Sequence, residues 1–193
     1  MLLWFGVSLP LIFFGAFLGF KQETLTFPCQ TNPIPRQIPP QVWYLSLPVS
    51  IIVGGLLPFG AVFVEMFFIL SSIWQHRFYY MFGFLFLVFI ILLVTCAEIS
   101  IVLCYLHLCA EDYRWWWRSF FTAGSTSIYM VLYAGYHYFA RAHPAAHFDL
   151  VSSSLFFGYI LIIGYAVGVL TGFVGFFSCF VFVRKIYGSI KID

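Results

Sequence analysis

Five long runs of nearly uninterrupted apolar residues limit what this chain can fold into. About 20 apolar residues in a helix cross the ~30 Å hydrocarbon core of a bilayer. Inside that core every backbone polar group must be bonded within the protein, so only helices and closed barrels can span it. The runs are continuous, whereas barrel strands alternate apolar and polar residues. We therefore predict an all-α fold, a polytopic transmembrane helix bundle with about five spans, at residues 2–20, 47–73, 79–107, 120–140 and 154–183.

The composition excludes a soluble domain. Of the 193 residues, 63% are hydrophobic and only 8% are charged, against roughly 25% charged in soluble domains. So few polar residues could not cover a soluble core of this size, and the mean hydropathy of +0.99 agrees. We expect membrane lipid to surround the protein. A net charge of +2 gives no indication of nucleic-acid binding.

The first 46 residues are predicted to form a span and a loop. Residues 2–20 lack the basic start and small-residue cleavage site of a signal peptide, so we expect a retained span. Residues 21–46 contain five prolines, which deny the backbone helical hydrogen bonds and favour an extended chain. A stiff connector is predicted here, with a proline-rich peptide ligand as the alternative.

The distribution of basic residues predicts the orientation. Five spans place the two termini on opposite sides of the membrane. Two basic residues, Arg77 and Arg141, fall on one side. The other side has seven, which are Lys21, Arg36, Arg114, Arg118, Arg184, Lys185 and Lys191. Because basic loops stay in the cytosol, we predict a cytosolic C-terminus, a cytosolic loop at 21–46 and a cytosolic tail at 184–193.

An aromatic and charged hairpin separates the third and fourth predicted spans. Tryptophan beside arginine is typical of the headgroup level, where an amphipathic ring has one apolar and one wet side. Glu111 and Asp112 are placed to neutralise the nearby arginines. We predict an interfacial anchor, with a ligand-binding role as the alternative. Its residues are Arg114, Trp115, Trp116, Trp117 and Arg118.

Two carboxylates lie within predicted spans. Glu65 is in the second span and Glu98 is near the middle of the third. A carboxylate at this depth is costly and usually faces the bundle interior or water. It can form an ion or proton site, or it can be a neutral acid that links helices by hydrogen bonds. Both readings are open.

Glycines and prolines predict where helices bend or approach one another. Pro58 and the glycines around it should kink or loosen the second span. Gly164, Gly168 and Gly172 recur every four residues, so they form a ridge on one helix face that allows close helix contact.

No enzyme motif is present, so we predict that the protein is not an enzyme and needs no cofactor. Metalloprotease, nucleophile-elbow and phosphate-loop patterns are missing. Cys104, His107 and Cys109 lie close in sequence, but residues two apart on a helix do not face one ligand, so no metal site is predicted. His107 and His137 are expected to be interfacial.

Long, unusual strings in this chain closely resemble the transmembrane-nine superfamily, also called nonaspanins. They include IPRQIP at 34–39, LPFGAVFVEMFFILSSIW at 57–74, LCAEDYRWWWRSF at 108–120 and FVRKIYGSIKID at 182–193. The resemblance covers nearly the whole chain but only the C-terminal third of the family's proteins. We therefore expect the family's lumenal N-terminal domain and about four spans to be absent from this chain.

The resemblance implies a Golgi and endosomal multi-pass membrane protein that helps to sort other membrane proteins. Its implied partners are client proteins with glycine-rich membrane spans and the coatomer coat. In the family a C-terminal Lys-x-Asp/Glu signal is read by coatomer, and here Lys191, Ile192 and Asp193 match it. The resemblance thus implies that the cytosolic tail at 184–193 is a sorting tail. The alternative function is an ion- or proton-coupled transporter or channel that uses Glu65 and Glu98.

Overall fold

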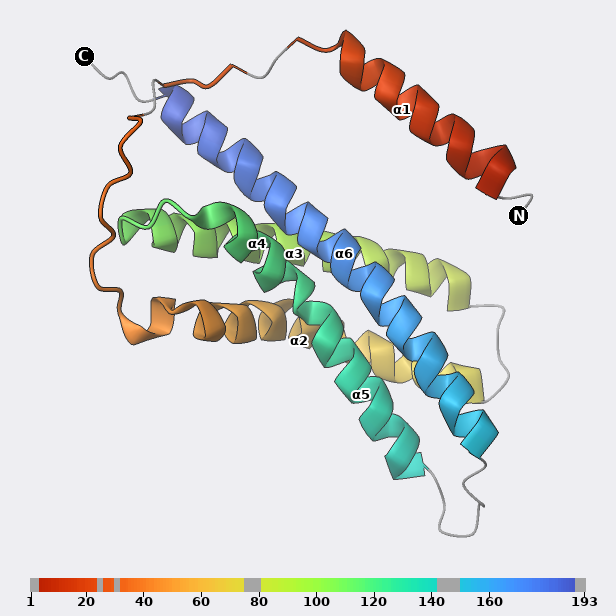
Figure 1. The fold of residues 1–193 in the computed structure, drawn as a ribbon. Helices are drawn as coiled ribbons and strands as arrows, with labels where there is room; N and C mark the ends of the chain where they lie inside the picture. The colour runs from red at the N-terminus through yellow and green to blue at the C-terminus, as the bar shows by residue number, and fades with distance from the viewer. Residues whose placement is uncertain (1–3, 24–25, 30–31, 75–80, 142–149, 190–193) are drawn as a thin grey trace.

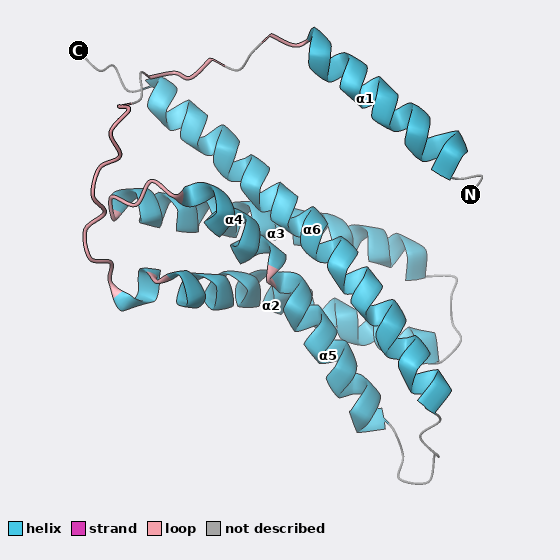
Figure 2. Ribbon diagram, in the orientation of Figure 1, coloured by secondary structure: helices cyan, strands magenta, loops and turns pink. Residues whose placement is uncertain are grey.

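Helices account for all the regular structure that the described residues contain (Figures 1 and 2). The structure is a computed structural model that describes residues 4–23, 26–29, 32–74, 81–141 and 150–189. After a π-helical turn at Trp4–Ser8, the helices are α1 (Leu9–Lys21), a 3₁₀ turn (Trp43–Leu45), α2 (Leu47–Trp74), α3 (Met81–Cys109), α4 (Trp115–Gly124), α5 (Thr126–Arg141) and α6 (Leu150–Ser189). The predicted all-α fold is confirmed.

Three helices contain segments that are long and apolar enough to cross a membrane: Leu47–Val64 in α2, Gly83–Cys109 in α3 and Val151–Ser189 in α6. They match the second, third and fifth predicted spans. With 40 residues, α6 is about 60 Å long, which exceeds the ~30 Å hydrocarbon core. Residues 184–189, predicted as part of the cytosolic tail, are the last turns of this helix.

The first predicted span contains a shorter regular helix than expected. α1 has 13 residues, with Pro10 in its first turn. Proline has no amide hydrogen and a fixed φ, so it suits the beginning of a helix rather than the interior. No residue of α1 is buried, and Figure 1 shows this helix apart from the others.

The fourth predicted span is two consecutive helices, α4 and α5, separated by Ser125. The Ser125 hydroxyl lies 2.8 Å from the Thr122 carbonyl oxygen, so it competes with the regular backbone pattern. Together the two helices extend from Trp115 to Arg141, which is about 40 Å. The pair is long enough to span a bilayer, although neither helix is long enough alone.

The bundle is built around α4 and α5, which pack against α2 and against α6. α3 contacts α2, α4 and α6 (Figure 1). The apolar core cluster is small: Val62, Val88, Leu92, Cys96 and Ala123. Most of the large apolar side chains are exposed instead. This distribution suits a protein surrounded by lipid, in which small and polar residues mediate helix contacts.

The segments predicted to share one side of the membrane do lie at one end of the bundle. The Gln41 amide donates to the carbonyl oxygen of Ala110 at 2.9 Å, which joins the proline-rich loop to the hairpin. Arg184 donates to the Thr26 carbonyl oxygen at 3.3 Å, which joins the same loop to α6. The cytosolic orientation of this end stays a prediction.

Candidate functional site

The glycine ridge of α6 lies against α4 and α5 of the same chain. A Cβ atom added to Gly168 would lie 2.6 Å from Ser127 Oγ, and one added to Gly172 would lie 2.9 Å from the Phe120 ring. At Gly164 the added atom would overlap the Val131 side chain. The ridge therefore permits a close helix contact inside this chain. Its predicted contact with a client helix stays a prediction.

A second close helix contact involves two glycines of α2 that were predicted to bend or loosen this helix. A Cβ atom on Gly54 of α2 would overlap the Thr122 side chain, and one on Gly55 would overlap Ser125 Oγ. Gly60, by contrast, has open space around its Cα. Gly54 and Gly55 thus allow α2 to approach the junction of α4 and α5. Sequence alone gave no signal for this pairing because the partner residues are distant in the chain.

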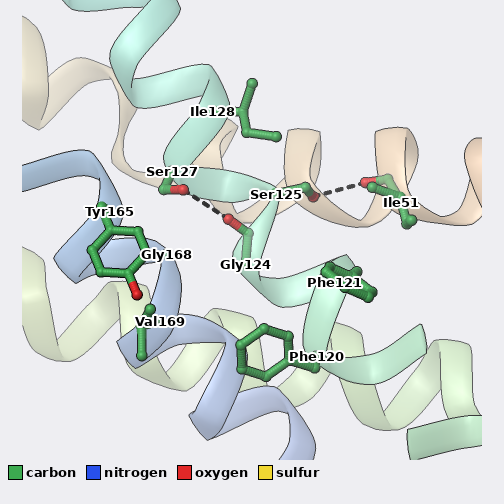
Figure 3. Close-up of a pocket in the computed structure, with 10 residues that line it drawn as sticks. All are labelled: Ile51, Phe120, Phe121, Gly124, Ser125, Ser127, Ile128, Tyr165, Gly168 and Val169. Atoms are coloured by element: carbon green, nitrogen blue, oxygen red, sulfur yellow. Dashed lines mark hydrogen bonds between the residues drawn. The ribbon is translucent and has the colours of Figure 1, made fainter. Parts of the chain in front are cut away.

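Hydroxyl groups hold the junction of α4 and α5 to α2. Ser125 Oγ donates to the Ile51 carbonyl oxygen at 2.8 Å (Figure 3). One helical turn later, the Tyr129 hydroxyl donates to the Ile52 carbonyl oxygen at 2.9 Å. Hydrogen bonds between hydroxyls and backbone oxygens are a recurring link between membrane helices. The break in the helix is therefore fixed by its neighbour.

A groove of about 240 Å³ lies beside this junction. Gly124 and Gly168 contribute backbone where larger residues would leave less room (Figure 3). Its apolar walls come from α2, α4, α5 and α6, and their outer residues are well exposed, Ile128 by 58% and Tyr165 by 76%. The full lining is Ile51, Phe120, Phe121, Gly124, Ser125, Ser127, Ile128, Tyr165, Gly168 and Val169. The groove can accept an apolar side chain or an acyl chain from the membrane.

A buried ion pair lies at the hairpin end of the bundle. Asp112 Oδ2 is 2.8 Å from Arg118 Nη2, and the Asp112 side chain is fully buried. Arg118 also contacts His107 Nδ1 at 3.1 Å, while His107 Nε2 lies 3.1 Å from Ser50 Oγ. Because arginine only donates, Nδ1 accepts and we assign the ring proton to Nε2. This network links the hairpin to α2, α3 and α4.

The turn that buries Asp112 has a backbone pattern typical of helix ends. The amide of Asp112 donates to the His107 carbonyl oxygen at 3.0 Å, and that of Glu111 donates to Leu108 at 3.1 Å. Glu111 has a φ of 59°, the left-handed position that glycine usually occupies in this motif. The turn directs Asp112 inward. Glu111 remains exposed and pairs with Arg36 at 3.5 Å.

The predicted interfacial anchor divides into inward and outward residues. Trp115 stacks on Phe176 of α6 with ring centroids 5.8 Å apart. Trp117 is 63% exposed and stacks on Phe121 of its own helix. Arg118 is bound to Asp112, while Arg114 stays largely exposed. The exposed members are positioned for a membrane interface, whereas Trp115 and Arg118 hold the hairpin to the bundle.

The other predicted site residues are not brought together. Glu98 lies on the exposed surface of α3. Glu65 is in α2, but its side chain is outside the described part of the structure, so a path using both carboxylates stays a prediction. The tail signal at Lys191, Ile192 and Asp193 is also outside the described residues. Cys104 and His107 are buried and His137 is buried in α5, while Cys109 is exposed.

Comparison with known proteins decides the family. The family model described as endomembrane protein 70 matches residues 1–147. This chain belongs to that family. Relatives named as members of the transmembrane 9 superfamily confirm the resemblance that the sequence strings showed. Member 9 of Arabidopsis thaliana is 60% identical over 191 residues, and human members 2 and 4 are 52% and 50% identical over the same length.

These transmembrane 9 superfamily relatives are much longer than this chain. The matches cover 99% of the chain but only 28–29% of each relative. No solved structure matches it. The chain is therefore similar to a portion of a multi-pass membrane protein, and the functional arrangement described above concerns that portion.

Proposed function

We propose that this chain acts in Golgi and endosomal membranes to sort other membrane proteins by binding their glycine-rich transmembrane helices. The observation that carries the proposal is the groove formed by α2, α4, α5 and α6, which has backbone at Gly124 and Gly168 and exposed residues, Ile128 and Tyr165, at its rim. Family membership supports the endomembrane setting.

The physical basis is close packing. Lipid tails are as apolar as leucine, so membrane helices associate through van der Waals contact and hydrogen bonds rather than by the hydrophobic effect. A client helix with small residues can bring its backbone near the groove, and an adjacent larger apolar side chain can enter it. The Tyr165 hydroxyl at the rim is exposed and available to bond a client backbone oxygen.

The C-terminal signal would set the compartment. α6 remains helical to Ser189, so Lys191 follows two residues after the end of this helix. A 60 Å helix exceeds the bilayer core, which supports a tail held away from the membrane and open to coatomer. Microscopy of the chain beside a Lys191→Ala variant tests this part: Golgi retention should be lost, and an unchanged location would contradict it.

The groove is tested by filling it. Ile128→Trp places a larger ring at the groove, whereas Ile162→Trp makes the same change at an exposed α6 residue outside the lining. Co-purification of a client with a glycine-rich span should fall several-fold with Ile128→Trp and remain unchanged with Ile162→Trp. Equal recovery from both variants, at equal expression and thermal stability, would refute the role of the groove.

A further inference from the structure

Glu98 lies close to the middle of a membrane-spanning helix. The apolar segment of α3 extends from Gly83 to Cys109. Cys109 is eleven positions after Glu98, which is about 16 Å along the helix axis. Half the hydrocarbon thickness is about 15 Å, so the carboxyl group is near the membrane mid-plane when Cys109 is near the interface.

The carboxyl group is on the outer face of α3. The inner face of this helix is marked by buried residues at steps of four, namely Val88, Leu92, Cys96, Ser100 and Cys104. Glu98 follows Cys96 by two residues, which is about 200° around a helix. Val94 and Val102, one turn before and one turn after Glu98, are also exposed. Glu98 therefore belongs to an outward stripe that is otherwise apolar.

No residue in the described part of the chain provides a hydrogen-bond or ion-pair partner for the Glu98 carboxyl group. Glu98 makes no hydrogen bond or ion pair with another described residue. Its side chain is too short to reach the headgroup region from the mid-plane, as lysine and arginine do near helix ends. A carboxylate facing lipid tails is unfavourable, and intramembrane acids usually pair with another group. The outward stripe is thus a surface that a second helix should cover.

We propose that the Glu98 stripe, Val94, Glu98 and Val102, binds a transmembrane helix that carries a lysine or arginine near mid-membrane depth. Charge complementarity selects this partner, because pairing with a cation offsets part of the cost of holding each charge in the membrane. The flanking valines supply an apolar contact beside the ion pair. The stripe is on α3, which contributes no residue to the groove, so this interaction stands independently of the proposed function.

Binding to synthetic helices tests the proposal. The full chain, labelled with a donor fluorophore, is reconstituted in phosphatidylcholine vesicles with acceptor-labelled leucine-rich peptides. One peptide has a central lysine, a second has leucine there, and a third has the lysine near its end. Energy transfer should show at least tenfold tighter binding of the central-lysine peptide. Glu98→Leu should remove that preference, and Glu98→Gln should reduce it.

A matched control is Glu111→Gln, which makes the same chemical change at an exposed carboxylate outside the span. It should keep the tenfold preference. Because Glu98 is exposed, its variants should also unfold at the parent temperature. Equal affinity for the three peptides would overturn the proposal, as would a preference that survives Glu98→Leu. Energy transfer between two copies of the chain that is lost in Glu98→Leu, without any lysine preference, would assign the stripe to self-association instead.

Discussion

Two adjacent acids in the hairpin should respond very differently to mutation. Asp112 is fully buried and lies 2.8 Å from Arg118, which is itself only 12% exposed. Glu111 is 56% exposed, and its ion pair with Arg36 is 3.5 Å long. Removing one partner of a buried pair leaves an uncompensated charge and costs about 3–5 kcal/mol. An exposed pair contributes about 0–1 kcal/mol.

These energies give a measurable difference in unfolding temperature. For a chain of this size, 1 kcal/mol corresponds to about 2–4 °C. Asp112→Ala should therefore lower the midpoint by about 6–20 °C, whereas Glu111→Gln should change it by no more than about 4 °C. The assay is thermal unfolding of the purified chain in detergent micelles, followed by circular dichroism at 222 nm.

Two further variants separate the charge from the shape of the side chain. Asp112→Asn keeps an acceptor for the Arg114 amide, which lies 3.1 Å from Asp112 Oδ1, so its loss should be smaller than that of Asp112→Ala. Adding Arg118→Leu to Asp112→Ala should recover part of the stability, because no buried unpaired charge then remains; Arg114, the other partner of Asp112, is 56% exposed and stays solvated. If Asp112→Ala and Glu111→Gln unfold at the same temperature, the buried pair does not stabilise the hairpin.

Two other comparisons test helix packing by the same assay. Gly168→Leu should destabilise the bundle by about 1–3 kcal/mol through overpacking against Ser127. The control Gly158→Leu should not destabilise it, because Gly158 has open space around it. Equal unfolding midpoints for the two variants would contradict the close contact at Gly168. Trp115→Ala should cost about 2 kcal/mol, below the usual value for a buried aromatic because the ring is partly exposed. Trp117→Ala should cost less than half as much as Trp115→Ala. A larger loss of stability with Trp117→Ala would show that the stacking of Trp115 on α6 is not what holds the hairpin.

The buried pair, the glycine contacts and the groove depend on one another through the position of α4 and α5. α4 is held at its beginning by Arg118 and Trp115 and at its end by the hydroxyl bond from Ser125 to α2. A loss at the hairpin should therefore also weaken binding at the groove. The mutations that test stability and those that test binding are best compared in the same preparations.

The sequence alone determined the class of protein and much of its topology. The continuous apolar runs required membrane helices, and α2, α3 and α6 appear where the runs predicted them. The alternation of the spans predicted that the proline-rich loop, the hairpin and the end of α6 share one side, and hydrogen bonds join these segments in the structure. The quoted strings identified the family. Such features depend on composition, length and order, which do not require knowledge of neighbouring helices.

The tertiary structure alone decided which face of each helix is used. α3 is apolar on nearly all sides, so no sequence pattern could show that Cys96 points inward and Glu98 outward. In sequence, the α6 ridge is compatible with a free surface or with an internal contact. The positions of Val131, Ser127 and Phe120 against its three glycines show that it is internal. Glu111 and Asp112 are equivalent acids in sequence, but the left-handed turn exposes one and buries the other. In each case the answer depends on where a distant helix lies, because burial and pairing are properties of two surfaces and not of one.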